Sequence, residues 1–165
     1  MDFLIRPFLP TDAPAVREII NNSILHTSHN YDYHPKSLEE VDVLFTEKIR
    51  DGLPVLVGEA NGEILGYATY GKFRAKPGYS KTLEHSIYLH EKAQGKGLGS
   101  EMMRQLIELA KAQGYHMMIA GMDSENVGSY RFHERLGFRE TARMPEVSFK
   151  FGKWLTLVFM QLRLD

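Results

Sequence analysis

Hydrophobic residues recur at the spacing of a helix in two stretches of the first fifty positions. The first stretch places its large apolar residues on one face: Val16, Ile19, Ile20 and Ile24. We expect Thr11 to cap this helix and Pro14 to lie in its first turn. The second stretch follows SLEE at residues 37–40, which has the form of a capping box. The pattern therefore predicts two helices joined by a polar and aromatic connection.

Alternating or continuous apolar runs predict the strands. We expect strands over residues 3–8, 55–60, 64–73, 83–89, 115–122, 139–144 and 154–163. Asn61 and Gly62 form a turn dipeptide suited to a tight hairpin between the second and third of these. Two further helices are expected over residues 97–113 and 126–136. This order predicts an α/β or α+β fold with a mixed sheet, in a single domain spanning residues 1–165.

Composition narrows the class of protein without naming a function. The chain is 43% hydrophobic and 25% charged, which is typical of a globular protein in water. Its formal net charge of -1 gives no basic field, so we expect no nucleic-acid partner. No run is long enough for a membrane span, and we expect no membrane partner and a cytoplasmic location. The absence of cysteine excludes disulfides and a thiolate nucleophile.

The sequence QGKGLGS at residues 94–100 is the main indication of function. It follows one apolar strand and opens a helix, and its three glycines allow main-chain N–H groups to approach an anion closely. A nucleotide-hydrolysing P-loop is excluded because Lys96 is followed by Gly97 instead of Ser or Thr. The dinucleotide fingerprint fails because Ser100 stands where glycine is required. The spacing of Gln94, Gly97 and Gly99 resembles the acetyl-CoA loop of the GNAT N-acetyltransferases.

Glu84 is the candidate general base. Side chains alternate along a strand, so Glu84, Ser86 and Tyr88 face one way, while His85 and Ile87 face the other. Because a strand rises about 3.3 Å per residue, Glu84 can lie near the reactive end of a cofactor whose pyrophosphate binds beyond residue 94. The alternative interpretation is a carboxylate at a strand edge in solvent.

Five motifs in register make the resemblance specific to one branch of that superfamily. These motifs are LEHSIYL (83–89), QGKGLGS (94–100), Asn126, FHERLGF (132–138) and FKFGKW (149–154). Together they look like the phosphinothricin and methionine sulfoximine acetyltransferases. The resemblance implies the GNAT fold, a mixed and mostly antiparallel sheet of about seven strands with about four helices. It also implies acetyl transfer from acetyl-CoA to the α-amino group of a small amino acid or analogue, in a ternary complex and without a metal.

The same resemblance assigns roles to single residues. The cofactor-binding residues it implies are Ile87, Tyr88, Leu89, Gln94, Gly95, Lys96, Gly97, Leu98, Gly99, Ser100 and Asn126. Arg74, Glu84, His85 and Ser86 fall at substrate-side positions, with Arg74 suited to binding a carboxylate. His133 occupies the position where many GNAT enzymes hold a tyrosine that protonates the leaving thiolate. Tyr130, one turn away, is the alternative acid, and the thiolate can also leave unaided.

Other interpretations remain open at this level. The acceptor can be a peptide N-terminus or a lysine, or the chain can be a sensor that binds acyl-CoA without turnover. Tyr31 and Tyr33 in the aromatic connection favour a closed pocket and hence a small acceptor. His26 and His29 are three residues apart, but no acidic or cysteine partner completes a persuasive ligand set around them, so we expect no metal site. The family resemblance further implies a homodimer.

Overall fold

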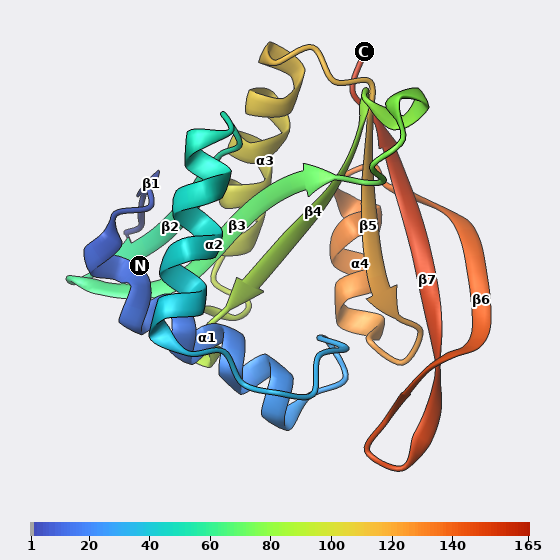
Figure 1. Ribbon diagram of the computed structural model, residues 1–165, viewed down its shortest axis with the longest axis horizontal. Coiled ribbons are helices and arrows are strands. Elements are labelled where there is room, and N and C mark those ends of the chain that lie inside the picture. The colour runs from blue at the N-terminus through green and yellow to red at the C-terminus, as the bar shows by residue number, and fades with distance from the viewer. Residues whose placement is uncertain (1) are drawn as a thin grey trace.

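In the computed structural model, which describes residues 2–165, seven strands form one sheet in the order β1-β2-β3-β4-β5-β7-β6 (Figure 1). The strands are β1 (Leu4–Pro7), β2 (Val55–Ala60), β3 (Glu63–Lys72), β4 (Thr82–Leu89), β5 (Met117–Asp123), β6 (Arg139–Lys150) and β7 (Lys153–Arg163). The helices are α1 (Ala13–His26), α2 (Leu38–Arg50), α3 (Leu98–Ala112) and α4 (Val127–Arg135). Every neighbouring strand pair is antiparallel except β4 and β5. The predicted mixed and mostly antiparallel sheet is confirmed.

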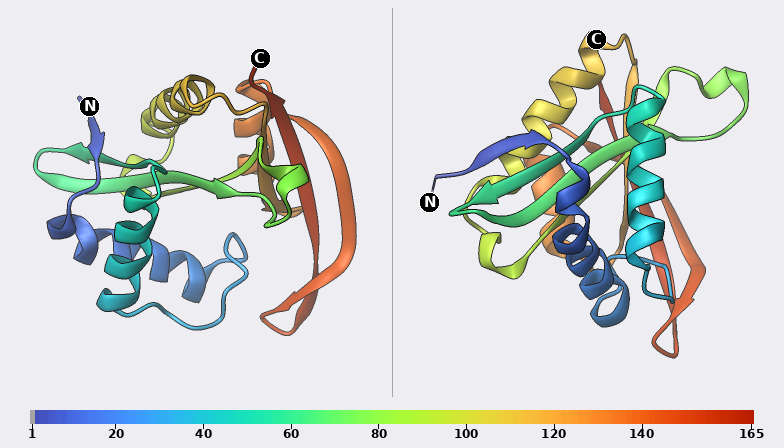
Figure 2. Two further views of the ribbon diagram at one scale, coloured as in Figure 1. Left: turned by 45° about the horizontal axis from the view of Figure 1, so that its top comes forward. Right: turned by 60° about the vertical axis from the view of Figure 1, so that its left-hand side comes forward.

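The helices cover both faces of the sheet. Helices α1 and α2 lie against one face and α3 and α4 against the other (Figure 2). Each face has its own apolar core, one around α3 and the other between α1, α2 and β2. The alternation predicted for β4 agrees with this division, because Leu83 packs in the core of α3 whereas Tyr88 packs against the core of α1.

The parallel pair β4 and β5 comes apart after three residues. Only Thr82, Leu83 and Glu84 of β4 are in register with β5, opposite Met117, Met118 and Ile119. Residues 85–89 stay paired with β3 on their other side. Figure 1 shows the two strands starting together at the top of the view and separating downward. The sheet therefore opens next to Glu84, and one edge of residues 85–89 is left without a β5 partner.

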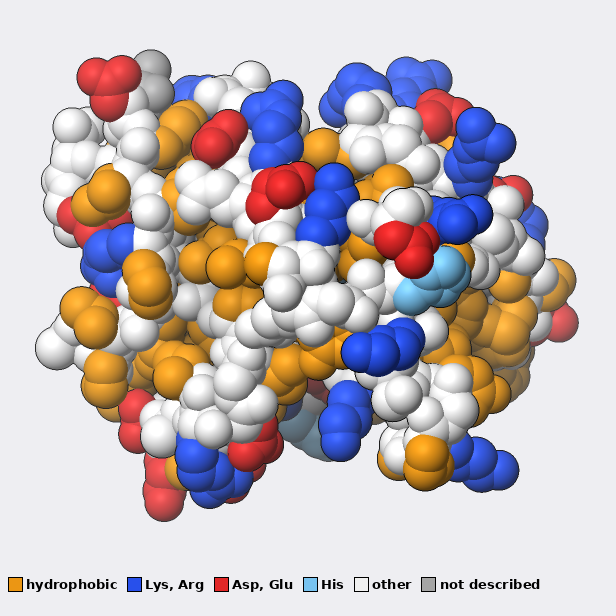
Figure 3. All heavy atoms as spheres, turned by 90° about the horizontal axis from the view of Figure 1, so that it is seen from above, with side chains coloured by type: hydrophobic (Ala, Val, Ile, Leu, Met, Phe, Trp, Pro, Cys, Tyr) orange, Lys and Arg blue, Asp and Glu red, His pale blue; other side chains and the backbone are white. Residues whose placement is uncertain are grey.

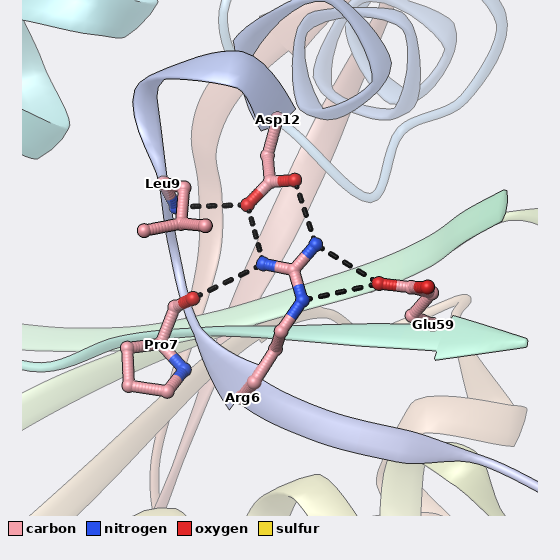
Figure 4. A network of polar contacts seen from close by, with 5 residues as sticks. All are labelled: Arg6, Pro7, Leu9, Asp12 and Glu59. Atoms are coloured by element: carbon pink, nitrogen blue, oxygen red, sulfur yellow. Dashed lines mark hydrogen bonds and ion pairs between the residues drawn. The ribbon is translucent and has the colours of Figure 1, made fainter. Parts of the chain in front are cut away.

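A charged cluster fixes the N-terminal strand to the sheet. Arg6 on β1 donates to both carboxylate oxygens of Asp12, at 2.8 and 2.9 Å, and to Glu59 on β2 at 3.0 Å (Figure 4). Asp12 also accepts the main-chain N–H of Leu9 at 2.8 Å. The hydrogen bonds from Arg6 hold the pKa of the buried Asp12 carboxyl below its usual range.

Two element boundaries predicted from the sequence were wrong. Thr11 does not cap α1, because a 3-10 turn over Pro10–Asp12 precedes the helix and α1 begins at Ala13. The strand expected over 139–144 runs on to Lys150. Its pairing with β7 shifts between Met144 and Ser148, around Glu146 at φ 57°, which breaks the alternation that marks a strand in sequence. The Asn61–Gly62 turn is confirmed, with φ of 53° and 77°.

The surface carries charges of both signs. On the face in Figure 3, basic and acidic side chains are interspersed with apolar patches, in keeping with a net charge of -1. No helix within residues 2–165 combines the length and apolar character that crossing a membrane requires.

Candidate active site

A cavity of about 530 Å³ lies where β4 and β5 separate. Its walls come from α1, from β4 and β5, from the loop after β4 and from α4. Ten of the residues singled out in the sequence line it: Glu84, His85, Ser86, Ile87, Tyr88, Leu89, Gln94, Gly95, Asn126 and His133. Residues far apart in sequence thus meet at the one place where the sheet opens.

Glu84 is half-buried in this cavity, at the last position of β4 that pairs with β5. Burial raises the pKa of its carboxyl, and the charge of Arg74 opposes part of that rise. Gly121 on β5 lies beside it, since a Cβ on Gly121 would be 3.6 Å from Glu84 Oε1 and 3.3 Å from Phe159 Cε1. A carboxyl with a raised pKa beside a cavity has the properties of a proton acceptor.

The glycine-containing loop leads directly into the N-terminus of α3. Gly95 and Gly97 have φ of +72° and +91°, a conformation that other residues rarely adopt. Within the loop, the N–H groups of Gln94 and Lys96 bond the carbonyls of Glu91 and Ala93. The first N–H groups of α3 have no partner in the helix, and no side chain among residues 2–165 caps it. Such an end binds anions, so the residues present fit a pyrophosphate.

Residues 96–100 of the loop do not line the cavity, and the buried ones among them hold the N-terminus of α3 in place. Lys96 and Gly97 are exposed. Leu98 and Gly99 are buried, and a Cβ on Gly99 would lie only 3.1 Å from Leu89 Cδ1. This close approach keeps the start of α3 against β4. Ser100 follows in the first turn of α3 and is half-buried.

His85 and His133 meet on the α4 side of the cavity. Their Nε2 atoms are 2.9 Å apart, and both side chains are buried. His133 Nδ1 is 2.8 Å from the main-chain oxygen of Ser129 and 3.3 Å from its Oγ. Tyr130, the alternative acid, is instead packed against the core and does not line the cavity.

Of the two predicted site residues Asn126 and Arg74, the first lines the cavity and the second does not. The Asn126 side chain lines the cavity and accepts the N–H of Ser129, which caps α4. Arg74 is exposed and is not among the lining residues. Its guanidinium lies 5.1 Å from the ring centroid of Phe73, near enough to Glu84 to act on the carboxyl pKa. Arg74 therefore stands at the outer rim instead of the cavity wall.

The connection between α1 and α2 contributes Thr27 and His29 to the cavity. The expectation that Tyr31 and Tyr33 wall the pocket was wrong. The Tyr31 hydroxyl donates to the buried Asp123 at 3.1 Å, which anchors the connection to β5. Tyr33 lines a separate, smaller hollow of about 270 Å³ beside the turn between β6 and β7.

Several lining residues escaped the sequence interpretation. They are Ile19, Asn22, Ser23, Thr27, Gly121, Met122, Gly128, Ser129, Phe132 and Arg135, together with His29, which was interpreted as solvated or capping. Those on α1 carry no sequence signal because they face a strand sixty residues away. Ser129 had a signal, since it precedes His133 by one helical turn. Residues 2–165 contain no cluster of three or more His, Cys, Asp or Glu side chains arranged to hold a metal.

A sheet that opens beside a carboxyl group, followed by an anion-binding helix end, defines an acyl-CoA-dependent transferase site. The model of the acetyltransferase (GNAT) family matches residues 21–138, which is more than half of the chain. The chain belongs to this family and is an acetyltransferase.

Individual relatives agree with this assignment over almost the full length. An L-methionine sulfoximine/L-methionine sulfone acetyltransferase of Salmonella typhimurium is 44% identical over 93% of this chain and 90% of its own length. A phosphinothricin N-acetyltransferase of Streptomyces viridochromogenes is 32% identical over 95% and 85%. The crystal structure of a phosphinothricin acetyltransferase from Sinorhizobium meliloti in complex with acetyl-CoA superposes with a TM-score of 0.96 at 32% identity, covering 100% and 90%.

Proposed function

We propose that this acetyltransferase moves the acetyl group of acetyl-CoA to the α-amino group of a small amino acid or analogue, of the methionine sulfoximine, methionine sulfone or phosphinothricin type. The observation that carries the proposal is the half-buried Glu84 at the opening between β4 and β5, next to the anion-binding end of α3. The names of relatives at 44% and 32% identity support the class of acceptor.

The open edge of β4 and the loop after it are the parts that would hold acetyl-CoA. The main chain of Ile87, Tyr88 and Leu89 is unpaired on the β5 side and is available to the pantetheine arm. Gly95 to Ser100 would hold the pyrophosphate with the main-chain N–H groups that are not already bonded within the loop, and Asn126 would contact the cofactor from the start of α4. Once bound, acetyl-CoA supplies an activated thioester carbonyl, which an N–H group of residues 87–89 would polarise.

Glu84 is the proposed general base that accepts the proton of the acceptor amine. The acceptor arrives as an ammonium ion and gives a proton to Glu84, directly or through one water, and its nitrogen then attacks the carbonyl carbon. The C–S bond breaks, the nitrogen releases its second proton to become the amide, and the departing thiolate takes up one proton, so that the step balances. Since the chain contains no cysteine, a thioester acyl-enzyme is excluded, and we expect both substrates to be bound together.

Arg74 is the proposed contact for the acceptor's acidic group. It stands at the rim next to Glu84, and a guanidinium can bind a carboxylate or phosphinate through two hydrogen bonds. Ser86, on the same face of β4, is exposed into the cavity and is placed to contact the acceptor. A small acceptor held between these groups brings its amine toward Glu84.

Release of free thiol from acetyl-CoA tests this function. We expect release with methionine sulfone, methionine sulfoximine or phosphinothricin, and little with peptides that offer a free N-terminus or a lysine. Arg74→Ala should raise the acceptor KM while leaving acetyl-CoA affinity unchanged, and Lys76→Ala, a second exposed cation of the same loop, is the matched control. Thiol release with peptides but with none of the small acceptors would overturn the proposed acceptor class. Acetyl-CoA binding without any turnover would identify a sensor.

We also propose that two copies of the chain associate through the turn between β6 and β7. Val147, Phe149, Phe151 and Trp154 are between 45% and 62% exposed, and β6 is an edge strand. An exposed apolar group of this kind is typical of a protein interface. Light scattering should give twice the mass of the chain, and Trp154→Asp should halve it. Leu4→Asp, on the opposite edge of the sheet, is the control, and a monomeric wild type would refute the interface.

A further inference from the structure

Two histidines that touch each other are sealed between β4 and α4. The His85 side chain is 7% exposed and that of His133 is 4% exposed. Phe132 and Phe138 pack edge-on to the His133 ring, with centroids 5.1 and 5.2 Å away. Because the surroundings are largely apolar, the few polar groups that face the two rings determine where their protons lie.

The main chain of α4 decides the tautomer of His133. Its Nδ1 is 2.8 Å from the Ser129 carbonyl oxygen, which can only accept, so Nδ1 carries the proton. In the neutral ring Nε2 is then an acceptor, and the His85 Nε2 at 2.9 Å must be the donor. With its proton on Nε2, His85 has a bare Nδ1. That atom is the one buried side-chain N or O within residues 2–165 that lacks a hydrogen-bond partner.

The electrostatics of the pair agree with this arrangement. Burial, followed by the proximity of His133, lowers the pKa of His85 to about 3, although the main-chain carbonyl of Ile119 on β5 opposes part of that lowering. Burial also lowers the pKa of His133, although the bond to Ser129 opposes it. Among charged residues, Glu84 is adjacent on the opposite face of β4 and Arg135 lies further along α4 in the cavity wall. Neither contributes to the pKa shift of either ring.

We propose that His85 is a positioning residue, which fixes His133 in its Nδ1–H tautomer by donating to His133 Nε2. His133 then meets the cavity as a ring of fixed orientation with both nitrogens already bonded, and its Nε2 is closed to an added proton as long as His85 occupies it. This inference rests on the proposed function and deepens it. It replaces the expectation of a proton-donating His133 with a ring that orients the cofactor side of the cavity, next to the Ser129 hydroxyl.

The test combines nitrogen NMR with two substitutions of His85. His85→Gln keeps an N–H donor for His133 Nε2, whereas His85→Leu fills the space without one. In the wild type without substrates, we expect His133 to show a protonated Nδ1, an unprotonated Nε2 and a pKa below its ordinary value, because burial lowers it. His85→Leu should leave His133 Nε2 without a donor, so that the Nδ1–H tautomer is no longer fixed and the nitrogen signals of His133 shift, while burial still lowers the His133 pKa. His85→Gln should restore the wild-type signal.

Kinetics provide a second readout. His85→Leu should lower kcat several-fold, while His85→Gln should keep the wild-type kcat. In a His133→Phe background, His85→Leu should cause no further loss, because His85 acts through His133. His116→Leu, which removes an exposed histidine at the far end of β5, is the control.

Each outcome bears on the proposal. A wild-type His133 that titrates near its ordinary pKa, or that is protonated on Nε2, would overturn it, as would an unchanged His133 signal in His85→Leu. Additive losses in the double variant would show that His85 acts independently of His133 and would refute the positioning role. The NMR arm uses the protein without substrates. A failure of acetyl transfer with every acceptor would therefore refute the proposed function separately from the ring arrangement.

Discussion

Gly58 on β2 leaves space for the first residue of α3, and we predict that adding a methyl group there damages both stability and cofactor binding. A Cβ at Gly58 would lie 2.6 Å from Leu98 Cδ1, 3.0 Å from Cδ2 and 3.1 Å from Cγ. Rotation of the terminal methyl groups cannot relieve a contact to Cγ. Leu98 is fully buried, so its side chain cannot move aside into solvent. The start of α3 must therefore shift away from β2.

The cost of this overpacking can be estimated. Extra methyl groups in a close-packed core cost about 1–3 kcal/mol, and we expect about 2 kcal/mol for Gly58→Ala because three atoms of Leu98 are affected. For a chain of this size that corresponds to a fall in Tm of roughly 4–8 °C. Because Leu98 immediately follows Gly97, the same shift displaces the N–H groups proposed to hold the pyrophosphate, and acetyl-CoA affinity should fall several-fold.

Urea unfolding and calorimetry with acetyl-CoA measure the two effects. Gly78→Ala is the matched control, since a Cβ there meets nothing within 4 Å and its φ is not positive. It should change stability by less than about 0.5 kcal/mol. Combining Gly58→Ala with Leu98→Ala should cost less than the sum of the single changes, because the second removes the atoms that clash. If Gly58→Ala is as stable as Gly78→Ala and binds acetyl-CoA as tightly as the wild type, the reasoning fails.

Three further changes test other parts of the molecule. Gly97→Ala imposes φ of +91° on an alanine, which costs about 1–2 kcal/mol, and calorimetry should show weaker acetyl-CoA binding; unchanged affinity would contradict this. Glu84→Gln should lower kcat by about 100-fold or more and abolish the acid limb of the pH–kcat profile. That limb should lie above the ordinary glutamate range because burial raises the Glu84 pKa, and its survival in the variant would exclude Glu84 as the base. Asp12→Asn should cost about 2 kcal/mol in urea unfolding. Because the Asp12 pKa is lowered in the folded protein, its carboxylate contributes fully to the free energy of unfolding above the ordinary carboxyl range, and this contribution is lost as the pH falls through the folded pKa. The free energy of unfolding of Asp12→Asn should therefore change less with acid pH than that of the wild type. Identical pH profiles for the two proteins would contradict this.

Local patterns predicted most of the elements correctly because their causes are local. The SLEE capping box is present, with Ser37 Oγ accepting the N–H of Glu40. The Asn61–Gly62 turn and the alternation along 83–89 follow equally from backbone preference and strand geometry. The start of α1 was misplaced because it depends on the hydrogen bonds between Asp12 and Arg6 on β1. The sequence around Thr11 gives no sign of this contact with another element.

The candidate site was only partly accessible from the sequence. The strand and loop residues 84–95 could be placed because they are contiguous and carry a motif. The pairing of His85 with His133 could not be predicted, because 48 residues separate them. The periodicity of a strand or of a helix indicates neighbours within that element and not contacts between a strand and a distant helix. Arg74 was assigned to the acceptor by resemblance alone, and its exposed position at the rim depends on how its loop folds over Phe73.

One structural feature explains why the functional groups lie together. Glu84 is the last residue of β4 in register with β5, and His85 is the first beyond it. Alternation turns Glu84 toward the α1 side, where the proposed proton acceptor stands, and His85 toward α4, where it meets His133. The separation of the strands then frees the edge of residues 87–89 for the cofactor. A one-residue change of register between β3 and β4, which pair from Leu83 to Leu89, would exchange the two faces, so the register of β4 in the sheet sets the chemistry of both sides.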